Sequence, residues 1–194
     1  MQKRLILVTS PPASGKTFLS KKLAENLKHI VYLDKDTLIP LSKQIFVVAN
    51  QEYNRSSEFF EKYIRNYEYD TILDLAFEAL AYDNKVLINA PFTREIRDVQ
   101  YMNQLKLKLK NCSAKLTVIW VITEPEVIHK RMIERNSDRD TWKLENWEEY
   151  IKSIDFSIPF TIDDPDDDLD FLKFYNSSQE EYTQSMKHIL SILE

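Results

Sequence analysis

Residues 5–17 carry the strongest local signal in this chain, with the sequence Leu5-Ile6-Leu7-Val8-Thr9-Ser10-Pro11-Pro12-Ala13-Ser14-Gly15-Lys16-Thr17. The four apolar residues at its start predict a buried strand over residues 4–9. Two prolines and a glycine then indicate a tight loop. Apolar residues at helical spacing follow and predict a helix over residues 15–28. The stretch therefore predicts a strand, a loop and a helix in succession.

The end of this loop, Gly15-Lys16-Thr17, fits the phosphate-binding pattern G-x-x-x-x-G-K-[ST], with Ser10 in place of the first glycine. Lys16 would reach the terminal phosphates of a nucleotide, and the Thr17 hydroxyl would bind Mg²⁺. A helix N-terminus favours negative charge and offers backbone N–H groups to it. The residues expected to hold the phosphates in this way are Ala13, Ser14, Gly15, Lys16, Thr17 and Phe18.

Gly15 is the only glycine among the 194 residues, although average usage would give about fourteen. The one glycine thus stands where a backbone must approach a ligand closely. The alternative interpretation is an ordinary loop with a surface lysine.

Length and composition limit the function. A chain of 194 residues has the size of one domain. Its net charge of −5 argues against a nucleic-acid surface, and one Cys with three His argues against a disulfide or a zinc site. The apolar segment near the N-terminus is too short for a signal peptide, and no apolar run reaches the length of a membrane span. We therefore expect a cytoplasmic protein without a membrane partner.

Strand-like and helical segments alternate along the chain, which predicts an α/β fold with a parallel sheet. The expected strands are residues 4–9, 30–33, 86–91, 115–122 and 171–175. The expected helices are residues 15–28, 38–50, 56–82, 95–111, 125–136, 144–154 and 179–194. The long segment at residues 56–82 is either one helix or two helices with a break near Tyr69 and Asp70. Residues 123–126 match a capping box. The six Asp between residues 163 and 170 indicate an acidic, solvated loop.

Ligands of open α/β sheets bind at the carboxyl ends of the strands, so the residues that follow each strand are site candidates. Asp34 and Asp36 follow the second strand, where a carboxylate can accept the proton of an attacking hydroxyl or hold Mg²⁺ through water. If the strand continues, only one of the two faces the phosphates. A solvated turn is the alternative. The third strand ends in Asn89 and not in the usual Walker B Asp. The carboxylate that binds the metal or acts as the base must then come from elsewhere, which favours Asp34 and Asp36.

Arginines supply the candidate cations. Arg94 follows the third strand and could bind a phosphate or carboxylate of a substrate, or pair with a neighbouring acid. Arg131 and Arg135 share one helix face, and Arg139 lies four residues further on, in the following loop. Phosphoryl transfer needs cations around the transferred group, which suits these three. A surface row of ion pairs is the alternative.

With these residues assembled, the chain resembles the small P-loop kinases, in the branch with zeta-toxin-like kinases, chloramphenicol phosphotransferase and polynucleotide 5′-kinase domains. The resemblance rests on residues 14–17, on Asp36 and on the Arg131/Arg135/Arg139 series. It implies a three-layer P-loop NTPase fold with a five-stranded parallel sheet in the order 2-3-1-4-5. It also implies one domain over residues 1–194, with a small helical lid at about residues 136–154. The family's frequent Arg three residues after the Asp is Ile39 here.

The resemblance implies an ATP-dependent phosphotransferase that moves the γ-phosphate to a hydroxyl of an unidentified small molecule. Asp36 would act as the base, with Lys16, Arg131 and Arg135 as catalytic cations. Asp34, Asp36 and Arg94 would contact the acceptor, and Arg135 and Arg139 the nucleotide. The alternatives are a nucleotide-binding switch or slow ATPase without an acceptor, and a polynucleotide 5′-kinase or zeta-like toxin kinase.

Overall fold

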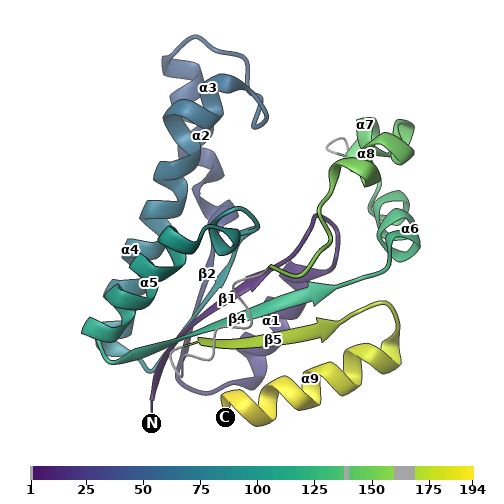
Figure 1. Cartoon of the computed structure of the whole chain (residues 1–194). Helices are drawn as coiled ribbons and strands as arrows, with labels where there is room; N and C mark the ends of the chain where they lie inside the picture. The colour runs from purple at the N-terminus through teal and green to yellow at the C-terminus, as the bar shows by residue number, and fades with distance from the viewer. Residues whose placement is uncertain (1, 138–139, 160–168) are drawn as a thin grey trace.

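The computed structural model describes residues 2–137, 140–159 and 169–194, and a parallel sheet forms its centre (Figure 1). The strands are β1 (Lys3–Thr9), β2 (Ile30–Asp34), β3 (Lys85–Asn89), β4 (Ala114–Ile122) and β5 (Leu169–Tyr175). They lie in the order β2-β3-β1-β4-β5, and each neighbouring pair is parallel. The predicted sheet and its strand order are confirmed.

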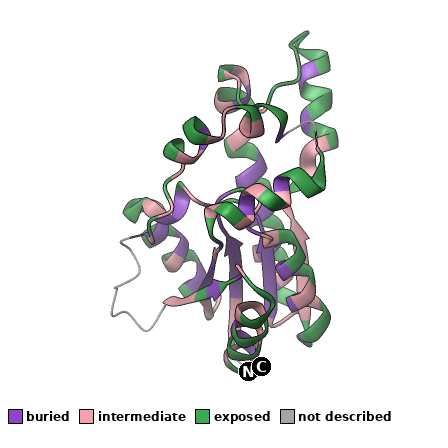
Figure 2. Ribbon diagram, turned by 90° about the vertical axis from the view of Figure 1, so that its right-hand side faces the viewer, coloured by how far each residue is buried: buried purple, intermediate pink, exposed green. Residues whose placement is uncertain are grey.

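Helices cover both faces of the sheet and complete the three layers. One face carries α1 (Lys16–Asn26) and α9 (Gln179–Leu193), and the other carries α4 (Asn66–Tyr82) and α5 (Val99–Asn111). Along β1, Leu5 and Leu7 pack on the second face, while Ile6 and Val8 pack on the first. A strand that is buried on both sides needs an unbroken apolar run, which explains the sequence of β1. Figure 2 shows the strands buried between the helical layers.

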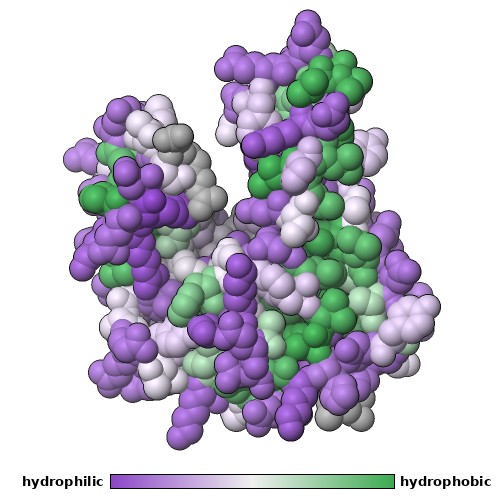
Figure 3. All heavy atoms as spheres, turned by 180° about the vertical axis from the view of Figure 1, so that it is seen from behind, coloured by the Kyte–Doolittle hydropathy of each residue, from purple (hydrophilic) through white to green (hydrophobic). Residues whose placement is uncertain are grey.

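Two projections rise from the end of the sheet where the strands have their carboxyl ends, and both termini lie at the opposite end (Figure 1). The first, which we call the arm, spans residues 39–65 and holds α2 (Ile39–Val48), α3 (Glu58–Phe60) and a π-helical turn, η2 (Glu61–Arg65). The second, the α6–α8 projection, holds α6 (Pro125–Arg135), α7 (Thr141–Glu145) and α8 (Trp147–Ser153). Figure 3 shows a deep notch between the two.

The sequence left open a break near Tyr69 and Asp70, and the structure has none there, because α4 runs unbroken from Asn66 to Tyr82 and the irregular turn, η2, comes before it. A stripe of α4 residues packs on the sheet at helical spacing, namely Tyr69, Ile72, Leu73 and Ala76. A break at residue 69 would interrupt this contact. The π turn instead lies where the chain leaves the sheet and joins the arm, whose own cluster is formed by Phe46, Phe60 and Ile64.

Other helix boundaries differ in detail. A 3₁₀ turn, η1 (Lys35–Leu38), follows β2, and another, η3 (Glu95–Arg97), precedes α5, whose N-cap is Asp98. The single helix predicted at residues 144–154 is instead the pair α7 and α8, which meet at a non-helical Asn146. None of the helices in the described part of the chain is both long and apolar enough to cross a bilayer.

The capping box predicted at residues 123–126 is wrong. The Thr123 hydroxyl donates to the Ser14 carbonyl, 3.1 Å away, because β4 ends beside the loop after β1. Glu124 is the N-cap of α6 and makes no side-chain capping bond. Of the six Asp between residues 163 and 170, only Asp170 lies within the described residues, and Arg4 and Lys115 bind its carboxylate.

Candidate functional site

The loop between β1 and α1 has a backbone that turns twice into the left-handed region, at Ala13 (φ 62°) and at Gly15 (φ 88°). Gly15 is the N-cap of α1, so the N–H groups of the first turn of that helix point out past it. A Cβ atom on Gly15 would lie 2.4 Å from Nδ2 of Asn176, which leaves no room for one. The positive φ and this close approach together explain why the chain's one glycine stands here.

The carbonyl oxygen of Ser14 anchors the loop to the neighbouring strand ends. It accepts hydrogen bonds from Nδ2 of Asn176 at 2.7 Å and from the Thr123 hydroxyl at 3.1 Å. Arg131 reaches the same carbonyl at 3.4 Å, and its other terminal nitrogen donates to the Asn176 carbonyl at 2.8 Å. Burial lowers the pKa of Arg131, but a guanidinium remains charged in proteins. These hydrogen bonds therefore fix the loop to the residues that follow β4 and β5, and the Arg131 guanidinium lies beside it.

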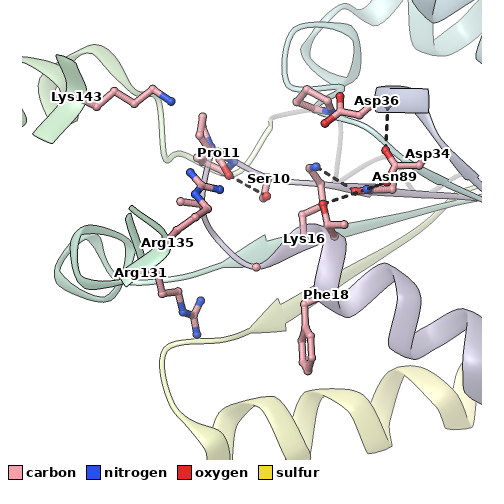
Figure 4. A pocket seen from close by; sticks show the side chains of 15 residues that line it. Ser10, Pro11, Lys16, Phe18, Asp34, Asp36, Asn89, Arg131, Arg135 and Lys143 are labelled. Atoms are coloured by element: carbon pink, nitrogen blue, oxygen red, sulfur yellow. Dashed lines mark hydrogen bonds between the residues drawn. The ribbon is translucent and has the colours of Figure 1, made fainter. Parts of the chain in front are cut away.

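A cavity of about 560 Å³ opens in front of this loop, at the carboxyl ends of the strands (Figure 4). It is lined by Ser10, Pro11, Pro12, Ala13, Gly15, Lys16, Thr17, Phe18, Asp34, Asp36, Asn89, Pro91, Arg131, Arg135 and Lys143. Most of the site residues predicted from the sequence meet here. Ser14 is buried behind the cavity, and its side chain donates to the Pro11 carbonyl. Arg139 lies outside the described residues.

Asn89, at the end of β3, connects the loop to the second strand. Its Oδ1 accepts a hydrogen bond from Lys16 at 3.0 Å. Its Nδ2 lies 3.1 Å from the Thr17 hydroxyl and 2.9 Å from Oδ2 of Asp34. The amide that stands where a Walker B Asp is usual thus joins Lys16, Thr17 and the Asp34 carboxylate, and from the sequence we expect the first two to bind phosphate and magnesium.

Asp34 and Asp36 line the same cavity but have different surroundings. Asp34 also accepts from the Tyr32 hydroxyl at 2.9 Å and from the backbone N–H of Asp36 at 3.0 Å. The Asp36 side chain is 59% exposed, with Nζ of Lys35 3.8 Å away. Because β2 ends at Asp34 and a 3₁₀ turn follows, strand alternation does not extend to Asp36. Asp34 is a fixed part of the site floor, and Asp36 faces the open cavity.

The α6–α8 projection contributes two further cations. Arg135 donates to the buried Asp140 carboxylate through Nε at 2.8 Å and Nη2 at 2.5 Å. Nζ of Lys143 lies 3.3 Å from the other oxygen of Asp140. Both cations line the cavity, so one buried carboxylate positions two positive charges over it. The sequence interpretation assigned no role to Asp140 or Lys143.

Arg94 does not line the main cavity. It forms an exposed ion pair with Glu61, with a closest distance of 2.7 Å. It borders two smaller cavities, one of about 360 Å³ that shares Ser10, Pro11, Pro12 and Pro91 with the main cavity. An acceptor that reaches Arg94 must therefore extend into this neighbouring space.

A second cavity, of about 290 Å³, lies on the other side of the loop. It is lined by Gly15, Phe18, Arg131, Asn176, Ser178, Gln179 and Tyr182. The Phe18 ring is more than half exposed and lies 5.8 Å from the Tyr182 ring, measured between centroids. Aromatic faces, a guanidinium and amide side chains suit a flat polar ring. The strand-end rule points to Asn176, because it follows β5, but the sequence interpretation did not apply it there.

The sequence matches the model of a family described as AAA domain over residues 5–156. No curated protein matches it. Among solved structures, it is similar to a gluconokinase from Sinorhizobium meliloti 1021, with a TM-score of 0.52 and 13% identity over 97% of this chain and 92% of that chain.

Two further structures are similar. Chaetomium thermophilum Kti12 in complex with ADP-AlF3 has a TM-score of 0.56 and 19% identity, over 98% of this chain and 99% of that chain. A structure of the PezAT chromosomal toxin-antitoxin system of Streptococcus pneumoniae has a TM-score of 0.58 and 17% identity, over 99% and 78%. At such identities the likeness shows the fold, which is that of small P-loop kinases.

Proposed function

This chain belongs to the AAA domain family, and we propose that it is an ATP-dependent phosphotransferase that moves the γ-phosphate to a hydroxyl of a small molecule. The observation that carries the proposal is the composition of the main cavity. Cations from the loop and from the α6–α8 projection face one part of it, and Asp34 and Asp36 face the other. A hydroxyl held beside Asp36 would meet a phosphate held beside Lys16.

The residues present fit a magnesium nucleotide. No side chain caps the N-terminus of α1, so the backbone N–H groups of its first turn can donate to phosphate oxygens, and Lys16 would contact the terminal phosphates. Thr17 would hold Mg²⁺, and Asp34 lies close to it, because the Asn89 amide bonds to both side chains. The ion supplies positive charge to the phosphate oxygens when bound. The nucleobase would occupy the second cavity, between Phe18 and Arg131.

In the proposed reaction, Asp36 accepts the proton of the acceptor hydroxyl as its oxygen forms a bond to the γ-phosphorus. The bond between that phosphorus and the β–γ bridging oxygen breaks, and ADP leaves with the bond's electrons. Lys16, Arg131, Arg135 and Lys143 would stabilise charge on the phosphate oxygens. Movement of the predicted lid, residues 136–154, would bring Lys143 to the phosphates and exclude water.

One observation favours a second candidate, a nucleotide-dependent switch with slow turnover. Asn89 replaces the usual Walker B carboxylate and cannot act as a base. Against it, a switch has no need of the exposed Asp36 in the cavity. ADP formation that rises on addition of a hydroxyl compound supports the transferase, whereas tight nucleotide binding with no such rise supports the switch.

The Lys16→Ala variant tests the nucleotide site. We expect its affinity for ATP, measured by calorimetry, to fall by about tenfold or more and its transfer activity to be lost, because a charged contact to phosphate is removed. Lys21→Ala removes an exposed lysine from the same helix and serves as the control. Unchanged ATP affinity in Lys16→Ala, with activity intact, would contradict the proposed site.

A further inference from the structure

The arginines of the arm and of the segment after β3 are each paired with a carboxylate of the protein, namely Arg55, Arg65, Arg94 and Arg97. Glu68 is buried and binds both Lys35, at 2.8 Å, and Arg55, at 2.7 Å to each carboxylate oxygen. The Ser42 hydroxyl donates to the same carboxylate at 2.5 Å. Lys35, the residue before Asp36, and Arg55 in the arm are therefore both bound to Glu68, and neither is among the residues that line the cavity.

The same matching continues around the acceptor side. Arg65 donates to Glu95 at 2.6 Å, with its guanidinium over the Tyr69 ring. Arg97 pairs with Asp155 at 3.1 Å and donates to the Ser157 carbonyl at 2.6 Å. Arg65 is largely buried in its pair, so its release would be costly.

The wall of the main cavity on the nucleotide side differs from the acceptor side, because cations line it. Among the described residues that line it, the cations come from the nucleotide side: Lys16, Arg131, Arg135 and Lys143. Arg131 is bound to backbone carbonyls, and Arg135 and Lys143 share one carboxylate. On the acceptor side the charged lining groups are Asp34 and Asp36. Figure 4 shows Arg131, Arg135 and Lys143 on one side of Lys16, and Asp34 and Asp36 on the other. The cavity is polarised, positive toward the nucleotide and negative toward the acceptor.

We propose that the acceptor is an alcohol without a phosphate or carboxylate group, and that a protonated amine on it increases its affinity. This inference rests on the proposed function and names the substrate class of the same site. An anionic acceptor would meet the exposed Asp36 carboxylate, whose neighbouring cation, Lys35, is buried and bound to Glu68. Like charges at such range oppose binding. An ammonium group would be attracted by the same carboxylates. A 5′-hydroxyl oligonucleotide, with its phosphates, is excluded on the same grounds.

Arg94 is the cation through which an anion could still be held. Its pair with Glu61 is exposed, and such pairs contribute little and exchange readily. Arg94 lies in the neighbouring cavity and not in the main one. A carboxylated acceptor bound through Arg94 is the rival result that the experiment must distinguish.

The experiment compares matched alcohols on the full-length protein loaded with Mg²⁺ and a non-hydrolysable ATP analogue. One set is glucosamine, glucose and gluconate, and a second is 2-amino-1,3-propanediol, glycerol and glycerate. Binding is measured by calorimetry or ligand-observed NMR, and transfer from ATP by phosphorus NMR. We expect the carboxylate of each set to bind at least about tenfold more weakly than the amine, and to be the poorest acceptor.

The Asp36→Asn variant should reduce the ratio between the affinities of amine and carboxylate toward one, because it removes the charge that discriminates. Asp74→Asn, which removes an exposed carboxylate of α4, should leave the ratio unchanged. The inference is overturned if a carboxylate or a 5′-hydroxyl oligonucleotide binds as tightly as the amines or more tightly. It is also overturned if the protein prefers carboxylates and Arg94→Ala abolishes that preference. Absence of binding by every amine also overturns it. ATP affinity that Lys16→Ala does not change would instead refute the proposed function.

Discussion

At the scale of single residues, Asp34 and Asp36 are the pair whose roles the geometry separates. Asp34 accepts from Tyr32, from Asn89 and from the backbone of the turn, so its carboxylate is already occupied on the cavity floor. Burial, together with the hydrogen bond to Asp34, raises the pKa of Tyr32, which remains a neutral donor. Asp36 faces the cavity with most of its side chain exposed. This difference favours a magnesium-side role for Asp34 and the base role for Asp36.

The variants Asp36→Asn and Asp34→Asn should therefore fail in different ways. For Asp36→Asn we expect ATP affinity near that of the wild type and a transfer rate lower by roughly 10² to 10⁴, the usual contribution of a positioned acid–base group. The loss should shrink as the pH rises, because hydroxide then replaces the missing base. For Asp34→Asn we expect weaker Mg²⁺-ATP binding. Calorimetry and single-turnover kinetics measure the two effects.

Two outcomes would contradict this assignment. If both variants keep full activity, the base lies elsewhere. If Asp36→Asn loses Mg²⁺-ATP binding but retains single-turnover transfer, Asp36 is a magnesium-shell residue and not the base.

Sequence reasoning finds residues whose role depends on local context and misses those whose role depends on a distant partner. Gly15, Lys16 and Thr17 are recognisable because the loop, the strand before it and the helix after it are adjacent in the chain. Asn176 is separated from Ser14 by 162 positions, and only the parallel order of β1, β4 and β5 brings them together. No local pattern records that contact.

At the scale of elements, strand identity is easier to predict than helix ends. The apolar runs of the buried strands are long and unbroken, so the predicted strands and their order are confirmed. The π turn at residues 61–65 and the division between α7 and α8 depend on where the arm and the projection leave the sheet. Those packing requirements override helical periodicity.

Asp140 acts at this scale, because it links α6 to α7 through Arg135 and Lys143. We expect Asp140→Asn to lower kcat roughly 10- to 100-fold, since two cations lose the group that positions them over the phosphates. Burial is the main reason that the pKa of Tyr150 is raised, and burial remains in the variant, so this hydroxyl stays neutral and cannot replace the lost charge. Steady-state kinetics with ATP measure the effect.

A double-mutant cycle distinguishes positioning from mere loss of structure. In an Arg135→Ala background, Asp140→Asn should cost little more, because the residue that it positions is already absent. Asp140→Glu should restore part of the activity. Additive losses, or loss of the folded state in thermal melts, would show that Asp140 supports the fold and not the site.

At the scale of the whole molecule, Glu68 joins the arm to the sheet. Its partners come from the turn after β2 (Lys35), from α2 (Ser42) and from the loop before α3 (Arg55), while Glu68 itself lies on α4. The arm's own cluster of Phe46, Phe60 and Ile64 is separate from the two clusters that cover the sheet. The buried ion cluster is therefore a main connection between the arm and the helix that packs on the sheet, α4.

Glu68→Gln tests this connection through stability. It leaves the Lys35 and Arg55 cations together without their shared carboxylate, and breaking a buried pair in this way costs roughly 3–5 kcal/mol. Glu61→Gln, which breaks the exposed pair with Arg94, is the control and should cost less than about 1 kcal/mol. Urea unfolding at pH 7 measures both free energies of unfolding.

The pH dependence of the stability difference between wild type and Glu68→Gln shows whether the charge of Glu68 is its cause. Burial alone would raise the pKa of Glu68, but the hydrogen bonds from Arg55, Lys35 and Ser42 outweigh burial and lower it from 4.5 to about 2. A carboxylate whose pKa is lowered by folding stabilises the protein fully above its unfolded value and loses that contribution as the pH falls toward the folded value. The stability difference between wild type and Glu68→Gln should thus be largest above pH 4.5 and shrink toward pH 2. A difference that stays constant with pH would mean that packing around residue 68, and not its charge, holds the arm to the sheet.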